Sequence, residues 1–184
     1  MLNANVFYTK WRDQQVTIGE TSGFETTTEN AGKSHYFGLE TEAVWTLDTP
    51  FDLFLNAGLL KSEFDEFMNN GEDYAGNQFP YAPRHTANLG LRLRPWKRLS
   101  GQFNAQHIGA FFSDPDNDPR SRADARLLLN ARLAIALPQG FSLAIYGRNL
   151  TDDTNEQGAL VAGTRLATRY GEARSAGVLL EWQL

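Results

Sequence analysis

The feature that most constrains the fold is an alternation of apolar and polar residues that recurs along the chain. In the last ten residues, SAGVLLEWQL, the apolar Val178, Leu180 and Trp182 share one parity, whereas Glu181 and Gln183 share the other. A period of two predicts a β-strand with one apolar face. The pattern recurs in seven upstream stretches, at 2–11, 34–47, 51–60, 85–96, 99–112, 123–137 and 141–150. The sequence therefore predicts about eight strands of about ten residues, the length of a tilted membrane-spanning strand.

The connections between these stretches alternate in length. Short ones, each containing a proline, lie at TLDTPF, RPWKRL and LPQGF; long ones, rich in Gly, Asn, Asp and Glu, lie at about 18–33, 63–84, 112–123 and 151–168. Short turns at one end and long loops at the other are typical of a transmembrane β-barrel. We therefore predict an all-β fold, an antiparallel meander that forms part of such a barrel. A soluble β-sandwich or a lipocalin-like binder is the alternative.

Composition narrows the classes of function. The chain of 184 residues has a net charge of −5 and no cysteine. The acidic balance argues against a nucleic-acid partner, which requires a basic face, and the lack of cysteine excludes disulfides and thiolate metal sites. No run of 18 apolar residues exists, so the sequence predicts no transmembrane helix.

The polar parity of the predicted strands carries several charges. In a porin-like barrel this parity faces a wet lumen and the apolar parity faces lipid. Arg126, Asn130, Arg132 and Arg148 are therefore expected on one face, and Leu127, Leu129, Leu133 and Ile145 on the other. Three tryptophans, Trp45, Trp96 and Trp182, lie beside the short connections. Their clustering predicts an interfacial aromatic girdle at one rim.

Four strings resemble the C-terminal barrel of TonB-dependent outer-membrane receptors. NAGKSHYFGLETE (30–42) resembles a hairpin entry of that family, and YAGNQFPYAPRHTANLGL (74–91) resembles the stretch before one of its strands. YGRNLTDDT (146–154) is similar to the end of the penultimate strand, and TRYGEARSAGVLLEWQL (168–184) to the last strand. The four strings occur in the family's order and at hairpin spacing along nearly the whole chain.

The resemblance implies a location, partners and a function. It places the chain in the bacterial outer membrane, in contact with its lipid, as part of a receptor that imports a siderophore or another scarce nutrient with energy relayed by TonB. It also implies a signal in the last strand for the barrel-assembly machinery, carried here by Gly177, Leu180, Trp182 and Leu184. The terminal residue departs from the family pattern, because Leu184 stands where a phenylalanine is usual.

The resemblance also sets an expectation about size. A complete receptor has about 22 strands around a plugged lumen, so residues 1–184 are expected to be the C-terminal part of the barrel, without the plug and the preceding strands. We therefore predict an open, curled sheet in which the first and eighth strands do not pair. A complete eight-stranded barrel with a structural or adhesive role is the competing interpretation.

No catalytic motif is present, so we predict neither an enzyme nor a cofactor or metal site. His35, His85 and His107 form no HxH or HExxH pair. Asp114, Asp116 and Asp118 alternate as in a calcium loop, but the central glycine and distal glutamate of an EF-hand are missing, so a solvated acidic loop is expected.

Two regions are candidates for binding an unknown small-molecule cargo. The acidic and aromatic loop EFDEFMNNGEDYAGN (63–77) is either a ligand-contacting loop or merely a soluble one, since loops carry binding in scaffolds of this kind. The polar parity offers a basic strip that would attract an anionic cargo; the alternative is that its cations pair with acids in the lumen or on the plug. The members of the strip are Arg92, Arg94, Arg126, Arg132 and Arg148.

Overall fold

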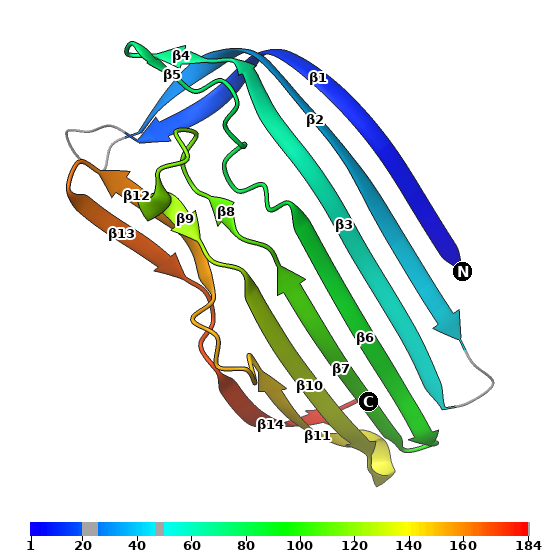
Figure 1. Cartoon of the computed structure of the whole chain (residues 1–184). Helices are drawn as coiled ribbons and strands as arrows, with labels where there is room; N and C mark the ends of the chain where they lie inside the picture. Colours follow the sequence, from blue (N-terminus) through cyan, green and yellow to red (C-terminus); the bar gives the residue numbers. More distant parts are fainter. Residues whose placement is uncertain (20–25, 47–49, 184) are drawn as a thin grey trace.

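The computed structural model describes residues 1–19, 26–46 and 50–183, and its main feature is one eight-stranded antiparallel sheet (Figure 1). The strands pair in the order β1-β2-β3-β6-β7-β10-β11-β14, so each strand lies beside its neighbour in the chain. Their bounds are β1 (Leu2–Gly19), β2 (Thr26–Thr46), β3 (Phe51–Glu66), β6 (His85–Trp96), β7 (Leu99–Ile108), β10 (Arg126–Ala136), β11 (Phe141–Arg148) and β14 (Ser175–Trp182). The predicted meander of eight strands is confirmed.

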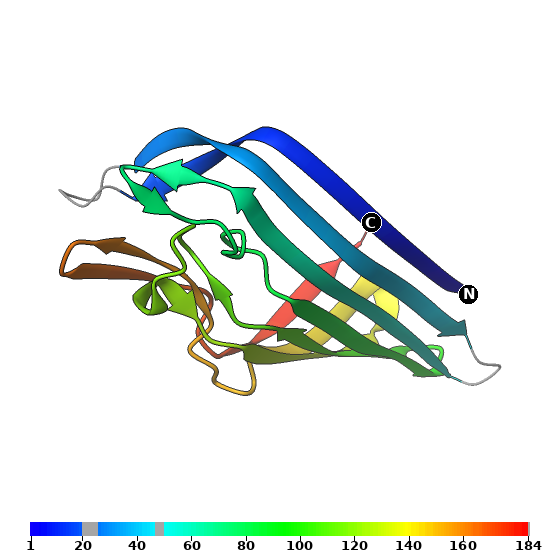
Figure 2. The ribbon, with the colours of Figure 1, turned by 45° about the horizontal axis from the view of Figure 1, so that its top comes forward.

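The sheet is curled but not closed. Among the described residues β1 pairs with β2 alone and β14 with β11 alone, so these two strands form the edges. Figure 2 shows that the sheet bends into a trough and that the long connections fold over one end of its inside. We call the inner side the concave face and the outer side the convex face. The predicted open sheet is therefore observed, and it contradicts the alternative of a closed eight-stranded barrel.

The three N-terminal strands are longer than predicted, with 18, 21 and 16 residues in β1, β2 and β3. The long loop expected at 18–33 is wrong, because β1 continues to Gly19, which pairs with Thr26 at the start of β2. The alternation is interrupted at Asp13, which has a positive φ of 54°. Beyond it the opposite parity is buried, as Val16 and Ile18 show, and this reversal hides the continuing strand from a simple count of alternating residues.

The remaining connections carry small elements of their own. Two-residue strands form hairpins in the first two loops: β4 (Met68–Asn69) with β5 (Glu72–Asp73), and β8 (Phe111–Phe112) with β9 (Arg122–Ala123). The last loop contains a longer hairpin, β12 (Glu156–Ala162) with β13 (Arg165–Tyr170). Two 3-10 turns, η1 (Pro119–Ser121) and η2 (Pro138–Gly140), complete the structure. In the described part of the chain, no helix is long and apolar enough to cross a membrane.

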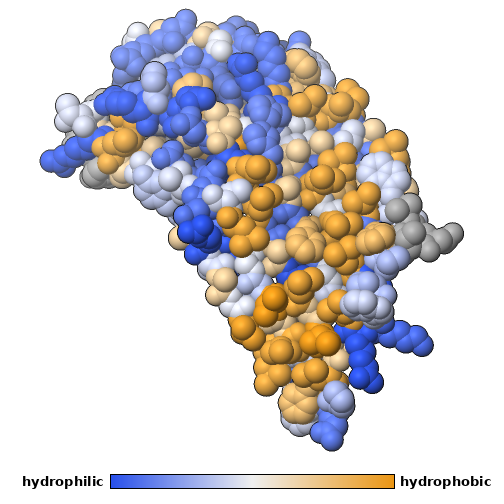
Figure 3. All heavy atoms as spheres, turned by 60° about the horizontal axis from the view of Figure 1, so that its bottom comes forward, coloured by the Kyte–Doolittle hydropathy of each residue, from blue (hydrophilic) through white to orange (hydrophobic). Residues whose placement is uncertain are grey.

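Side-chain faces follow the predicted parity. Leu127, Leu129, Leu133 and Ile145 are each at least 36% exposed on the convex face. Because Arg132 pairs directly with Tyr146, the even residues of β10 and β11 share the other, concave face. Figure 3 shows apolar side chains spread over the strand region and hydrophilic ones gathered toward the loop end. A broad apolar surface of this kind is the expected lipid-facing side of a barrel wall.

The three predicted girdle tryptophans lie at the short-turn end of the sheet. Trp45 is one residue from the end of β2, Trp96 ends β6 and Trp182 ends β14. All three are exposed, and the Trp182 indole donates to the carbonyl oxygen of Gln139 at 3.1 Å while its ring stacks on Phe141. Their depth in a bilayer stays a prediction.

Candidate functional site

Part of the concave face carries amide and carboxyl side chains. It takes even residues from β3, β6, β7, β10 and β11, even residues of β2 after Lys33, and odd residues from the start of β1. A hollow of about 730 Å³ lies over β1–β3, β6 and β7, and its polar lining includes Asn3, Asn5, Glu40, Glu42, Asn56 and Asn88. This lining offers hydrogen-bond donors and acceptors to a polar solute.

An aromatic hollow lies on the same face, nearer to the loops. Tyr36 of β2 lies at its centre, with ring centroids 5.9 Å from Phe7, 5.7 Å from Trp11 and 6.3 Å from Phe79, all edge-on. These four rings, together with Tyr81, line a space of about 430 Å³. Aromatic rings in such edge-to-face arrangements give an apolar body with polar handles at Tyr and Trp, so the aromatic hollow can hold a planar or aromatic ligand.

A buried cluster fixes the loop 67–84 above the aromatic hollow. Phe64 and Phe67 are almost fully buried and pack against Tyr74, together with Val16, Ile18 and Ala31 from the far ends of β1 and β2. Phe79 extends from this cluster to the aromatic hollow, since its ring lies 4.8 Å from Phe64 and 6.3 Å from Tyr36. The extensions of β1 and β2 therefore support the loop, and this is the structural use of the unpredicted strand residues.

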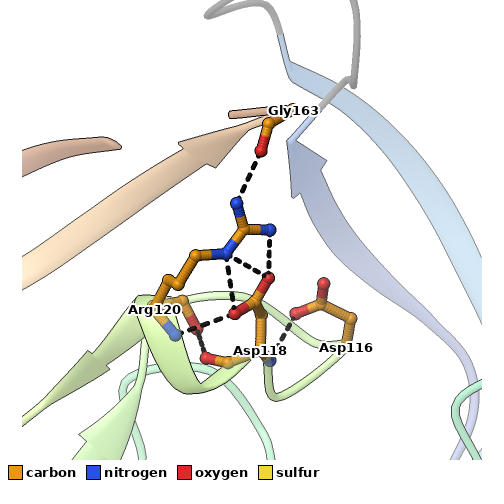
Figure 4. Close-up of polar contacts among 5 residues, drawn as sticks. Asp116, Asp118, Arg120 and Gly163 are labelled. Carbon is orange, nitrogen blue, oxygen red and sulfur yellow. Dashed lines mark hydrogen bonds and ion pairs between the residues drawn. The ribbon is translucent and has the colours of Figure 1, made fainter. Parts of the chain in front are cut away.

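The loop 109–125 connects the other two loops. The side chain of Asn117 bonds the backbone of Gln78 twice: its Oδ1 accepts from the backbone N–H at 2.8 Å, and its Nδ2 donates to the backbone carbonyl oxygen at 2.9 Å. On its other side, Arg120 donates to the carbonyl oxygen of Gly163, at the tip of the β12–β13 hairpin, at 2.6 Å (Figure 4). Asp118 holds that guanidinium in place, and its own amide nitrogen donates to Asp116. The three loops are thereby tied into one layer.

The acidic loop, which the sequence predicts to be solvated, is instead partly buried and hydrogen-bonded to its neighbours. Partial burial, together with the charges of Asp116 and Asp118, raises the pKa of Asp114 to about 6. The opposite holds at Asp118, where the Arg120 hydrogen bond lowers the pKa of the carboxyl group. The loop therefore favours the protonated form of Asp114 and the charged form of Asp118.

The five predicted arginines divide into two groups. Arg92, Arg94 and Arg132 lie together around a small hollow of about 150 Å³ toward the short-turn end. Arg126 and Arg148 lie at the loop end, at the start of β10 and the end of β11. The structure therefore does not form one continuous basic strip.

Most of these arginines have partners. Arg94 bonds Asp52, Arg132 lies 3.1 Å from Glu181, and Arg148 lies 3.4 Å from Glu172. Arg126 donates to the Glu156 carbonyl oxygen at 2.6 Å, and the Arg92 guanidinium lies 5.3 Å from the centre of the Phe54 ring. Pairing within the chain, the alternative to an anionic-cargo role, describes these geometries well, and a role in binding cargo stays a prediction.

Three of the four residues of the predicted assembly signal, Gly177, Leu180 and Trp182, lie in the last strand. Leu180 and Trp182 face the convex side, whereas Gly177 faces the concave side directly opposite Tyr146. Leu184 lies outside the described residues. Their role in assembly stays a prediction.

The aromatic hollow is the main feature that the sequence interpretation missed. Phe7 and Trp11 have the polar parity of their strand, as does Tyr36, so an alternation count treats the three as noise. The sequence did contain a clue: two neighbouring strand-like stretches carry aromatic residues at the positions that are expected to face the lumen. Within the described ranges, no group of three or more His, Asp or Glu side chains is arranged to hold a metal ion.

Comparisons with known proteins agree with this geometry. Residues 1–150 match the model of the family described as TonB dependent receptor-like, beta-barrel. The pesticin receptors of Yersinia pestis and Yersinia enterocolitica are each 27% identical over 180 residues, covering 96% of this chain and 26% of theirs. The chain therefore spans about a quarter of the length of these relatives.

Solved structures give the same result. The ferric yersiniabactin uptake receptor of Yersinia pestis superposes with a TM-score of 0.80 at 25% identity, over 97% of this chain and 27% of that protein. The siderophore receptor of Acinetobacter baumannii superposes with a TM-score of 0.74 at 22% identity, over 97% of this chain and 25% of that one. With the open sheet, its apolar convex face and the family match over residues 1–150, the chain belongs to the TonB-dependent receptor β-barrel family, whose members lie in the outer membrane of Gram-negative bacteria.

Proposed function

We propose that residues 1–184 are the C-terminal part of the barrel of a receptor that takes up a ferric siderophore across the outer membrane. The observation that carries the proposal is the aromatic hollow of Phe7, Trp11, Tyr36, Phe79 and Tyr81, which faces the lumen side directly beneath the interlocked loops. A solute entering from the loop end meets these rings first and the polar hollow next. Two relatives are named for such cargo, which supports this class of ligand.

In this proposal the chain supplies the wall and loops, and the rest of the receptor supplies the plug and the remaining strands. The plug contacts TonB, which relays energy to it, and the barrel-assembly machinery reads the last strand. The chain itself performs no covalent chemistry. Its contribution is binding: aromatic contact at the loops, then exchange of hydrogen bonds along the amides of the concave face.

The test uses the complete receptor in an iron-limited strain lacking its other siderophore receptors. Growth and iron-55 uptake are measured with a panel of ferric chelates that includes ferric yersiniabactin, a ferric catecholate and ferric citrate. One chelate is expected to support uptake, and Tyr36→Ala with Trp11→Ala is expected to weaken its binding at least tenfold, since each stacked ring contributes about 1 kcal/mol beyond its buried area.

Tyr8→Ala serves as the matched control, because Tyr8 is an exposed aromatic residue on the convex face of the same strand. It is expected to leave binding unchanged. Equal uptake by Tyr8→Ala and by the Tyr36→Ala, Trp11→Ala double variant would show that the aromatic hollow is not the binding surface. If no chelate in the panel supports uptake by the wild-type receptor, siderophore uptake itself is contradicted.

A further inference from the structure

A row of basic side chains crosses the convex face on five neighbouring strands. On β1, β2, β3, β6 and β7, the first strongly polar residue beyond the apolar part of the convex face is in each case a lysine or a histidine. The five residues of this row are Lys10, His35, Lys61, His85 and His107. The pairing register aligns them, since Lys10 is directly opposite His35, and Lys61 is opposite Phe37, two residues from His35.

The row continues across the next two strands. His85 is paired with Leu59, two residues before Lys61, and His107 with Ala87, two residues after His85. The imidazole rings of His85 and His107 stack with centroids 5.1 Å apart. All three histidines of the chain therefore lie at one level on the outside of the wall.

An exposed apolar surface lies immediately on the short-turn side of the row. Val6, Tyr8, Phe37 and Leu59 are 79%, 59%, 47% and 56% exposed on the convex face. Toward the loops, the surface is charged. The row therefore marks the level at which the convex face changes from an apolar to a charged surface, as is expected where a barrel wall passes from acyl chains to headgroups.

The charges around the row are not balanced within the described chain. Arg12 and Lys33 lie directly opposite one another on the same face, and like charges in that position are destabilising. Glu66 lies 2.5 Å from Lys33, Asp65 lies 2.7 Å from His35, and Glu63 lies 3.3 Å from Lys61. Among the described residues, no carboxylate lies within 4 Å of the nitrogen atoms of Lys10 or Arg12.

We propose that this surface binds the phosphate-bearing headgroup of an anionic lipid in the outer leaflet. Lys10 and Arg12 contact the phosphate, which offsets the repulsion between Arg12 and Lys33, and the acyl chains lie along Val6, Tyr8 and Phe37. Lys33 and Lys61 have their own carboxylates and contribute less charge. A row confined to β1–β7, with no cation on the convex faces of β10, β11 and β14, gives the wall one lipid-binding side.

The test uses the complete receptor in phosphatidylcholine nanodiscs doped with a bis-phosphorylated glycolipid, and native mass spectrometry counts the retained glycolipid. Lys10→Gln with Arg12→Gln is expected to lower retention roughly 25-fold at low ionic strength, since each cation at a membrane surface contributes about fivefold. Arg165→Gln with Arg169→Gln removes two positive charges from the β13 hairpin, among the loops, and is expected to change nothing.

Two further arms identify the ligand. The same glycolipid with its phosphates removed is expected to be retained as weakly as by the double variant, and inorganic phosphate at millimolar concentration is not expected to displace the intact lipid. Equal retention of the phosphorylated and dephosphorylated forms would overturn the proposal, as would equal losses in the two double variants. Displacement of the intact glycolipid by inorganic phosphate would also overturn the proposal, because it would show a site that binds phosphate without requiring a lipid.

Discussion

Three concave-face glycines are each covered by the aromatic ring directly opposite on the next strand. The pairs are Phe54 with Gly90, Phe7 with Gly38, and Tyr146 with Gly177. A Cβ built on the glycine would lie 1.7, 2.5 and 2.6 Å from atoms of the facing side chain, closer than real Cβ atoms approach. An aromatic ring laid over a glycine fills the missing side chain and fixes the register of the two strands.

We expect Gly177→Val to disturb the last strand, because the added side chain displaces Tyr146 and costs about 1–3 kcal/mol as overpacking. In outer membranes carrying the complete receptor, the fraction with folded, heat-modifiable gel mobility should fall. Ala176→Val is the control, since it adds apolar volume to the convex face one residue away. Similar folded fractions in the two variants would contradict this packing role for Gly177.

The Asp114 carboxyl group makes the loop layer sensitive to pH. Its folded pKa of about 6 lies above its unfolded value near 4, so folding favours the protonated form. Loop stability is therefore highest below about pH 4 with respect to this group and falls as the pH rises through about 6. The effect of Asp118 has the opposite sign. Because its pKa is lowered in the folded state, its carboxylate stabilises the loop at neutral pH, and this contribution is lost as the pH falls below about 4.

Asp114→Asn is therefore expected to stabilise the loop 109–125 at pH 7.5 by about 1 kcal/mol, after allowance for solvent screening of a half-exposed group, and to have little effect at pH 4. Hydrogen exchange of the loop amides at the two pH values, corrected for intrinsic rates, measures this. Asp124→Asn is the control, as Asp124 lies in the same loop and is highly exposed. Equal protection of wild type and Asp114→Asn at pH 7.5 would contradict the burial of this charge.

At the scale of elements, the eight strands were predictable because each combines alternation with a bounded length. The extension of β1 and β2 was not, because the reversal of faces at Asp13 breaks the pattern that the count depends on. The β12–β13 hairpin was missed for another reason: Ala159 to Ala162 is a short apolar run without alternation, and its turn at Gly163 resembles loop sequence.

The candidate site was predictable only in part. Parity places Arg126, Arg132 and Arg148 on the concave face, but their partners depend on the path of the loops. Glu156 and Glu172 lie in the last connection, 30 and 24 residues from Arg126 and Arg148. Periodicity carries no information about such contacts.

The β12–β13 hairpin is expected to depend on Arg120. Arg120→Gln removes the donor to Gly163 and the partner of Asp118. It should raise amide exchange several-fold in residues 163–168, because β13 is mostly exposed, whereas β12 has buried residues and a further bond from Ala159 to Ser113. Arg122→Gln is the matched control, since Arg122 pairs only with the exposed Asp124. Unchanged exchange in Arg120→Gln would show that the hairpin is held by other contacts.

At the scale of the whole molecule, the unpaired edges of β1 and β14 limit what this chain does alone. Exposed edges offer unpaired backbone donors and acceptors to other chains, and the apolar convex face requires lipid or detergent. The chain resembles a section of wall whose stability depends on neighbouring strands, and about a quarter of each relative corresponds to it.

We therefore expect the isolated 184-residue chain to form no stable monomer after refolding in detergent, and to show no heat-modifiable mobility. Size-exclusion chromatography with light scattering should find aggregates or higher oligomers. The complete receptor, refolded in the same way, is the control and should give a monodisperse barrel. A monodisperse, heat-modifiable monomer of the isolated chain would mean that the two edges pair with each other.

The assignment of the convex face to lipid and of the concave face to water is tested most directly by spin labels along β10 of the complete receptor. Labels at positions 127, 129, 131 and 133 should collide with oxygen, which is concentrated in the bilayer, whereas labels at 128, 130 and 132 should collide with a water-soluble nickel chelate. Alternating accessibility with the odd positions in lipid is the expected result. Equal accessibility at Leu129 and Asn130, or the reverse assignment, would contradict the membrane-wall interpretation.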